Sequence, residues 1–282
     1  MVTNRPIPLE HPKKTSKWST VVKEKTIKQV LPPIVALVIV VGLWELIVLL
    51  AGTPPYIMPK PSDIVQAAIT NWSNLSSALM TTIVSSVTGF LLSVIIGIGL
   101  AVMMASSEWV ERSFYPYAVI LQTIPVVAVA PIIVIWLGSG MSAIVVIAFL
   151  IGFFPMLSNT LIGLNATDRN MQDLFTLYHA SKWQLMWKLR FPAALPFVIA
   201  GMKISCTLAV VGAIVGEYIA GVGGGAGGLG YSITVAASRI QTPYLFALGL
   251  SAAMLGIVFF LVVNALSKKL LGSWHDSEMK KE

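Results

Sequence analysis

The segment NATDRNMQDLFTLYHASKWQLMWKLRFPAALP, residues 165–196, is the one long stretch in the middle of the chain that is not uniformly apolar. Apolar runs long enough to cross a bilayer lie on either side of it. A charged, aromatic-rich segment held between membrane spans requires a partner or a surface on which to act. Its basic residues are Arg169, Lys182, Lys188 and Arg190, and its large aromatic residues include Phe175, Tyr178, Trp183 and Trp187.

The composition is that of a membrane protein. Of the 282 residues, 56% are hydrophobic and 11% are charged, whereas a soluble domain carries about 25% charged residues. A soluble fold of this length has too little interior to bury so much apolar surface. The single cysteine, Cys206, lies in an apolar run and excludes an internal disulfide framework. The polar, basic N-terminus does not have the pattern of a cleavable signal peptide.

Six windows have the length of about 20 apolar residues that the hydrocarbon core requires. The third and fourth are separated only by LGSGM, residues 137–141, which predicts a helical hairpin. The windows are residues 31–51, 80–105, 115–138, 141–163, 197–220 and 244–266. They predict a basic N-terminal tail over residues 1–29, a six-helix domain over 30–266 and a C-terminal tail over 267–282.

The distribution of lysine and arginine predicts the orientation in the membrane. With a cytoplasmic N-terminus, sixteen of the 19 fall on the cytoplasmic side and two, Lys60 and Arg239, on the exterior side, while Lys203 lies within the fifth span. Cytoplasmic loops of membrane proteins carry such an excess. Both termini and residues 165–196 are therefore predicted to be cytoplasmic. The same asymmetry accounts for the net charge of +7 without a nucleic-acid partner.

Three segments outside the spans have local patterns. Residues 18–29 are expected to form a helix along the membrane surface, and the first exterior loop is expected to lead into a helix capped by Ser62 or Asp63. The last exterior loop contains GVGGGAGGLGYS, residues 221–232. It lacks the lysine of a phosphate-binding loop, so a flexible or tightly packed re-entrant connection is predicted.

Two spans carry a small residue at every fourth position, which places these residues on one helix face and predicts close packing against other helices. They are Gly89, Ser93, Gly97, Ala101 and Ala105 in the second span, and Gly201, Ser205, Ala209 and Ala213 in the fifth.

Four residues are candidates for a translocation path. Glu217 continues the stripe of the fifth span, and an ionisable residue in a span is a functional candidate by default. Both a structural hydrogen-bonding role and a gating role are open for it, whereas for Glu45 the structural role is favoured. Gln122 and Thr123 precede Pro125, at a proline break that either lines a path or only kinks a packing helix. No catalytic residue, metal ligand or cofactor site is predicted.

Residues 180–204, ASKWQLMWKLRFPAALPFVIAGMKI, resemble the EAA loop of permease subunits of bacterial ABC importers, in the branch that includes nitrate, sulfonate and taurine permeases. Asp173, Leu174 and Phe175 stand where that family has Glu-Ala-Ala, and His179 stands where it has glycine. Other stretches that resemble the branch are YPYAVILQTIPVVAVAPIIVIWLGSG (115–140), FFPMLSNTLIGL (153–164) and VGAIVGEY (211–218).

The resemblance implies an all-α polytopic membrane protein with six transmembrane helices and the type I ABC importer permease fold, in the bacterial inner membrane. As partners it implies a second permease copy, two cytoplasmic ATPase subunits, an extracytoplasmic substrate-binding protein and membrane lipid. It also implies that residues 165–196, the central loop, dock on the ATPase. The residues expected to couple to the ATPase are Asp173, Phe175, Tyr178, His179, Ala180, Ser181, Lys182, Trp183, Trp187 and Arg190.

Local patterns within this loop agree with two short helices. Thr167 or Asp168 is expected to cap a helix over residues 169–179, and a break is expected near residues 180–181. A second helix is expected over residues 182–190, ended by Pro192. The aromatic side chains are expected to be buried anchors of an interface, with Lys182, Lys188 and Arg190 at its rim or on anionic lipid.

The substrate is open among nitrate, alkanesulfonate or taurine, and thiamine-pyrimidine precursors. Residues 122–136 look closest to permeases for the pyrimidine precursors, and the absence of mid-membrane cations argues against a bound anion. The alternative function is an ion- or proton-coupled secondary transporter or a channel. Inverted repeats and mid-membrane charges are frequent in that class, and neither is evident in this sequence.

Overall fold

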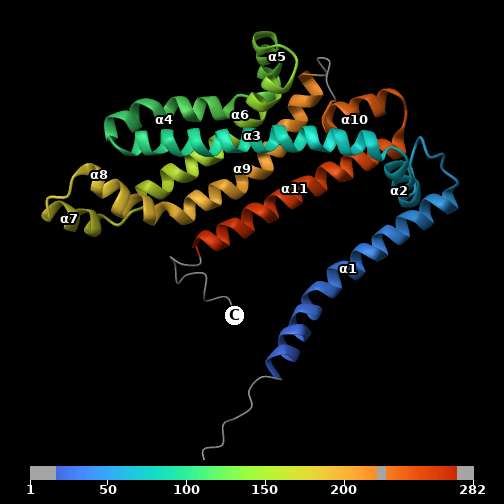
Figure 1. The fold of residues 1–282 in the computed structure, drawn as a ribbon, viewed down its shortest axis with the longest axis horizontal. Coiled ribbons are helices and arrows are strands. Elements are labelled where there is room, and N and C mark those ends of the chain that lie inside the picture. Colours follow the sequence, from blue (N-terminus) through green and yellow to red (C-terminus); the bar gives the residue numbers. More distant parts are fainter. Residues whose placement is uncertain (1–16, 221–226, 272–282) are drawn as a thin grey trace, which may run out of the picture. The chain divides into compact units, whose positions relative to one another are not determined.

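The computed structural model describes residues 17–220 and 227–271, and within these ranges it contains helices and short connections without a strand (Figure 1). The predicted all-α class is therefore confirmed for the described part of the chain. Residues 1–16, 221–226 and 272–282 lie outside it, and with them most of both predicted tails and the first half of the glycine-rich loop. The chain divides into two units, residues 1–63 and 64–282.

Within the described ranges, five helices are long and apolar enough to cross a membrane, and the bent pair α4 and α5 raises the number to six if it counts as one span. The helices are α1 (Lys17–Ala51), α2 (Pro61–Thr70), α3 (Trp72–Ala105), α4 (Glu108–Thr123), α5 (Val126–Leu137), α6 (Met141–Asn165), α7 (Arg169–Leu177), α8 (Lys182–Leu185), the π-helix η1 (Met186–Arg190), α9 (Phe191–Ala220), α10 (Leu229–Ser238) and α11 (Thr242–Leu271).

The first unit contains α1, which joins the expected surface helix and the first span into one helix of 35 residues. Near its end the Glu45 carboxylate accepts hydrogen bonds from the Ser62 backbone N–H (3.1 Å) and hydroxyl (2.8 Å). Ser62 therefore does not cap α2. The Asp63 carboxylate accepts from the Lys60 N–H at 3.2 Å instead, which is the backward half of a capping box.

The second unit is built on α6, against which α3 and α9 pack through small residues. A Cβ atom at Gly89 of α3 would lie 2.6 Å from the Cβ of Ala148, and one at Gly212 of α9 would lie 2.7 Å from the Cα of the same residue. The Ser93 hydroxyl donates to the Phe149 carbonyl (2.9 Å) and the Ser205 hydroxyl to the Gly152 carbonyl (2.8 Å). These contacts confirm that both stripes face protein.

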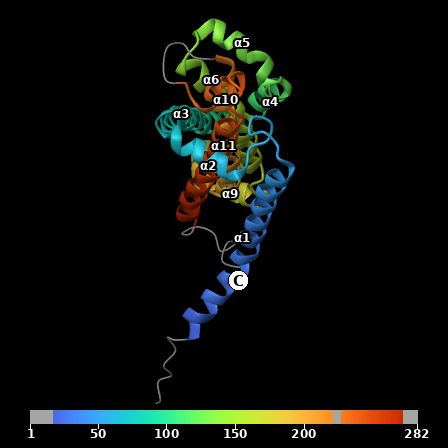
Figure 2. The same ribbon diagram turned by 90° about the vertical axis from the view of Figure 1, so that its right-hand side faces the viewer.

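The third predicted span is not a straight helix. The axes of α4 and α5 differ in direction by 97° across a break of two residues, and the change of direction is visible in both views (Figure 1 and Figure 2). Pro125 holds the preceding Ile124 in an extended conformation, with ψ 122°. Beyond the bend, α5 packs Ala130 and Ile133 into one buried cluster with side chains of α6. The predicted hairpin across residues 137–141 is therefore present, and Gly138 makes its turn at φ +79°.

Gly89 and Gly99 of α3 test the close packing, because only Gly89 lies against another helix. We expect Gly89→Ala to lower the free energy of unfolding by about 1–3 kcal/mol, since its methyl group collides with α6. The control is Gly99, where an added methyl group would meet nothing within 4 Å. Gly99→Ala should be neutral or stabilising by up to about 1 kcal/mol. Thermal unfolding of the purified protein in detergent measures both, and equal effects would contradict the packing.

Candidate functional site

The central loop begins with a capped helix. The Asp168 carboxylate accepts a hydrogen bond from the Asn170 backbone N–H at 2.8 Å, so Asp168 is the N-cap of α7. Thr167, the other predicted cap, is buried and its hydroxyl donates to the Leu164 carbonyl at 3.3 Å. The start of α7 is thus determined by a local hydrogen bond, from the Asn170 backbone N–H to the Asp168 side chain.

The predicted break after this helix is confirmed, and His179 makes it. Its backbone is left-handed, with φ +53°, a conformation that glycine adopts without strain and other residues seldom adopt. Ser181 then starts α8 with a full capping box, in which its hydroxyl accepts from the Gln184 N–H (3.2 Å) and the Gln184 side chain accepts from the Ser181 N–H (2.9 Å).

The prediction that Pro192 ends the second helix is wrong. α8, η1 and α9 form one continuous helical run from Lys182 to Ala220. A proline removes one N–H donor and its ring collides with the carbonyl four residues earlier. Here the preceding turn is a π-turn, in which the Phe191 N–H donates to the Met186 carbonyl. The wider turn gives room to the ring, so α8 and η1, which we call the coupling segment, are joined rigidly to the span that follows.

The loop lies at the end of α9 that is remote from α10 (Figure 1), and it presents large apolar side chains that are exposed. Tyr178 is 80% exposed, Leu177 76%, Trp183 69% and Trp187 41%. The Trp183 and Trp187 rings make an edge-to-face pair with centroids 5.4 Å apart. We call the exposed side chains the coupling surface: Met171, Leu174, Leu177, Tyr178, Trp183 and Trp187.

Three members of the coupling surface were not predicted from the sequence. Met171, Leu174 and Leu177 recur at intervals of three on α7, which was a sufficient signal for one apolar helix face. Phe175, by contrast, is half-buried against its own chain. Less of its side chain is therefore exposed for contact with a partner than the sequence led us to expect. Among the remaining predicted coupling residues, Asp173, His179, Ser181 and Lys182 are exposed beside this surface, whereas Ala180 is half-buried.

Arg190 does not lie at the rim of this surface, contrary to expectation. Its guanidinium is half-buried and donates to the carbonyls of Leu164 (Nε, 3.0 Å) and Ala105 (Nη1, 2.6 Å) and to the Asn165 side-chain oxygen (Nη2, 2.7 Å). These acceptors belong to the C-terminal ends of α3 and α6. Sequence alone could not reveal this, because the partners are 25 to 85 residues away.

The predicted path residues fall into two places. Gln122, Thr123 and Pro125 lie together at the bend between α4 and α5 and are exposed, with the Thr123 hydroxyl donating to the Ile120 carbonyl at 2.7 Å. Glu217 is not part of this group, because its hydrogen-bond partners lie on α3 and α10.

Glu217 is the centre of a buried polar cluster. Its carboxylate, in a side chain that is 1% exposed, accepts from the Thr82 hydroxyl (3.0 Å), the Ser85 hydroxyl (3.3 Å) and the Gly230 N–H (2.9 Å). The last donor belongs to the first turn of α10, where a negative charge is favourable. A side chain at Gly228 would collide with the carboxylate. These contacts favour the structural role for Glu217.

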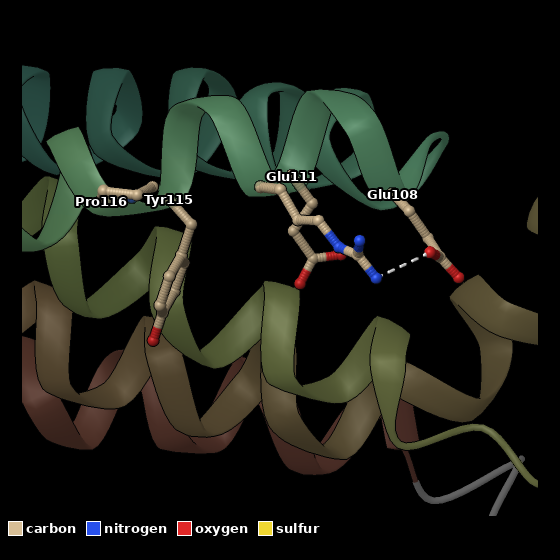
Figure 3. A pocket seen from close by; sticks show the side chains of 5 residues that line it. Glu108, Glu111, Tyr115 and Pro116 are labelled. Carbon is tan, nitrogen blue, oxygen red and sulfur yellow. Dashed lines mark hydrogen bonds and ion pairs between the residues drawn. The ribbon is translucent and has the colours of Figure 1, made fainter.

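A hollow of about 460 Å³ on α4 is lined by Glu108, Glu111, Arg112, Tyr115 and Pro116 (Figure 3). Arg112 pairs with Glu108 at 3.2 Å, and both side chains are more than 80% exposed. Glu111 instead accepts a hydrogen bond from the Asn165 side chain at 2.7 Å. In the part of the chain that the structure describes, no group of three or more His, Cys, Asp or Glu side chains is placed to hold a metal ion.

Residues 93–272 match the family model described as "Binding-protein-dependent transport system inner membrane component". The chain is 36% identical over 244 residues to the formylaminopyrimidine transport permease protein ThiX of Halalkalibacterium halodurans, covering 86% of this chain and 96% of the relative. It is 33% identical over 248 residues to the riboflavin transport system permease protein RibX of Chloroflexus aurantiacus, covering 86% and 90%.

A solved structure has the same fold. A chain from the inward-facing conformations of the MetNI methionine ABC transporter superposes with a TM-score of 0.59 at 16% identity, over 73% of this chain and 98% of that one. At this identity the likeness extends to the fold alone.

Substitution of Glu217 tests the structural role against the gating role. We expect Glu217→Ala to lower the free energy of unfolding by about 1–3 kcal/mol, because it leaves the buried Gly230 N–H without its acceptor and removes one acceptor of the Thr82 and Ser85 hydroxyls. Glu217→Gln should lower the free energy of unfolding by less, since the glutamine side chain keeps one acceptor oxygen. The measurements are thermal unfolding in detergent and transport activity per folded molecule, with the exposed neighbour Tyr218→Phe as control. A gating role would instead lower transport per folded molecule without loss of stability.

Proposed function

Because the chain belongs to the family of binding-protein-dependent transport system inner membrane components, we propose that its coupling surface is the docking site for the cytoplasmic ATPase of an ABC importer. Membership makes the chain a multi-pass permease subunit of the inner membrane, which works with an ATPase and a substrate-binding protein and carries no catalytic domain of its own. The family match favours this importer over an ion-coupled secondary transporter or a channel.

The observation that carries the docking proposal is the exposure of large apolar side chains outside the six spans predicted from the sequence. Tyr178, Leu177 and Trp183 are each about two-thirds or more exposed, on a loop that also carries Lys182, Lys188 and Asp173. A cluster of exposed apolar side chains bordered by polar ones is typical of a protein interface. Tryptophan and tyrosine are also enriched among the residues that dominate binding energy.

The proposed orientation places both termini and the coupling surface in the cytoplasm. The support is the excess of lysine and arginine in the segments on that side. The proposed assembly has two copies of this permease, two ATPase subunits and one extracytoplasmic binding protein, in contact with membrane lipid. Such a symmetric pair gives each ATPase one coupling surface to bind.

The proposed mechanism is alternating access driven from the coupling surface. Closure of the ATPases on ATP displaces the docked α7 and α8. Because α8, η1 and α9 are one helical run, this displacement is passed to a helix that packs along α6 and α3. The spans then open outward, where the binding protein delivers substrate, and ATP hydrolysis reverses the change. Gln122, Thr123 and Pro125 are the proposed path residues, and Glu217 is proposed to hold α10 in place.

The proposed substrate is a pyrimidine precursor or a related neutral nitrogen heterocycle. Two relatives at 33% identity or more are named as permeases for formylaminopyrimidine and for riboflavin. A permease for aliphatic sulfonates in Bacillus subtilis is 27% identical over 241 residues. Lys203 is the one cation within the six predicted spans, and it stands near the cytoplasmic start of the fifth. The middle of the spans therefore offers no cation for an anionic substrate such as nitrate or a sulfonate.

Docking is tested by co-purification of the ATPase with the permease. We expect Leu177→Ala together with Trp183→Ala to weaken ATPase binding by on the order of 10-fold to 100-fold, because both remove exposed anchors of the interface. The matched control is Trp136→Ala on α5, a tryptophan that is 78% exposed but lies outside the loop. Retention of the ATPase by the double variant at the level of the control would contradict the docking assignment.

The substrate is tested with the permease, its ATPase and its binding protein reconstituted in proteoliposomes. We expect ATP-dependent uptake of a radiolabelled aminopyrimidine, and no competition by nitrate, taurine or an alkanesulfonate. Inhibition of uptake by one of these anions at concentrations equal to the pyrimidine would overturn the substrate class. Loss of uptake when the binding protein is omitted is the control for an importer of this type.

A further inference from the structure

Arg190 stands at the junction of the coupling segment and the membrane-spanning helices. It is the last residue of η1, two turns after the exposed Trp183 and one residue before α9 begins. Its guanidinium donates to acceptors on two other helices, namely the Ala105 carbonyl at the end of α3 and the Leu164 carbonyl in the last turn of α6. Carbonyls in the last turn of a helix have no partner within their helix, so a cation is favourable there.

The contacts of Arg190 continue through Asn165 to α4. The Asn165 side-chain oxygen accepts from Arg190 Nη2 at 2.7 Å, and its side-chain nitrogen donates to Glu111 Oε1 at 2.7 Å. The Asn165 side-chain oxygen therefore accepts from the Arg190 cation, and its side-chain nitrogen donates to the Glu111 anion. Both polar atoms of the amide thus have a partner of suitable charge. Charge-assisted bonds at this length are among the strong ones.

The helix at the far end of this chain of contacts is loosely packed. α4, which the structure describes in full, buries none of its side chains. The hollow in Figure 3 lies directly beside Glu111. Arg112, the nearest cation on the same helix, is paired with Glu108 at 3.2 Å, which leaves the Glu111 carboxylate for Asn165. A polar bond thus holds this turn of α4 where packing does not.

We propose that Arg190 is a positioning residue which, through Asn165 and Glu111, makes α4 follow the movement of the coupling segment. The inference rests on the proposed docking of an ATPase at the coupling surface. α4 leads directly into the 97° bend that carries Gln122 and Thr123, so the link connects ATPase movement to the proposed path. It is a second route of transmission, distinct from the continuous helical run of α8, η1 and α9.

The test uses the permease with its ATPase and binding protein in proteoliposomes, and measures substrate imported per ATP hydrolysed. Glu111→Leu removes the acceptor at the far end of the link, and its matched control is Glu108→Leu, in the same turn of α4. Glu111→Gln keeps an acceptor oxygen for Asn165 and serves as the conservative rescue. Arg190→Met, with Arg112→Met as its charge-matched control, removes the near end.

The expected result is a fall of about five-fold or more in substrate imported per ATP for Glu111→Leu and Arg190→Met. Glu111→Gln and both control variants should remain close to the wild-type ratio. ATPase co-purification should be unchanged for Glu111→Leu, since Glu111 lies outside the coupling surface. The thermal midpoint should fall no further than it does in Glu108→Leu. This combination identifies a loss of coupling and not of assembly.

Two results would overturn the link. One is a wild-type ratio of substrate to ATP in Glu111→Leu, and the other is a fall in uptake that only parallels a fall in the thermal midpoint, which indicates a merely structural role. Failure of the wild-type permease to retain any ATPase would be different, because it contradicts the docking proposal itself. The co-purification measurement separates the two failures.

Discussion

The close approach of α3 and α9 to α6 is the constraint on which the second unit depends. Gly89 and Gly212 bring both helices within contact of one residue, Ala148, and at that separation the hydroxyls of Ser93 and Ser205 reach carbonyls of α6. Lipid offers no hydrophobic driving force for helix association, so packing and such hydrogen bonds must supply it. The three helices thereby form a closely packed core. The more loosely packed α4 and the coupling segment are attached to this core.

The two glutamates placed in spans, one in each unit, have the same physical task. Glu45 accepts from the backbone and hydroxyl of Ser62 in the first turn of α2, and Glu217 accepts from the Gly230 N–H in the first turn of α10. In each case a carboxylate from a long helix satisfies an N–H of a short one, where the helix dipole favours negative charge. For both glutamates, the hydrogen bonds to the start of a short helix favour a structural role.

Hydropathy and spacing sufficed for the spans, for both small-residue stripes and for the break at His179, because each depends on neighbours in the sequence. The bend between α4 and α5 was foreseeable at Pro125, but its angle was not, since it is set by Ala130 and Ile133 packing with α6. Arg190 was misplaced at the rim because its acceptors come from distant helix ends. Leu174 and Leu177 were missed although their spacing was visible, because an apolar face on so short a helix is equally compatible with packing inside the chain.

The π-turn of η1 also sets the rotational phase between the coupling segment and α9. An α-helix advances about 100° per residue, so the residue that the π-turn accommodates offsets the faces before and after it by about that angle. The edge-to-face pair of Trp183 and Trp187 consequently points outward, while Ala194 and Val198 on the following turns are buried. Loss of one residue from this segment would therefore rotate Trp183 and Trp187 by about 100° relative to α9, even with every residue of the coupling surface retained.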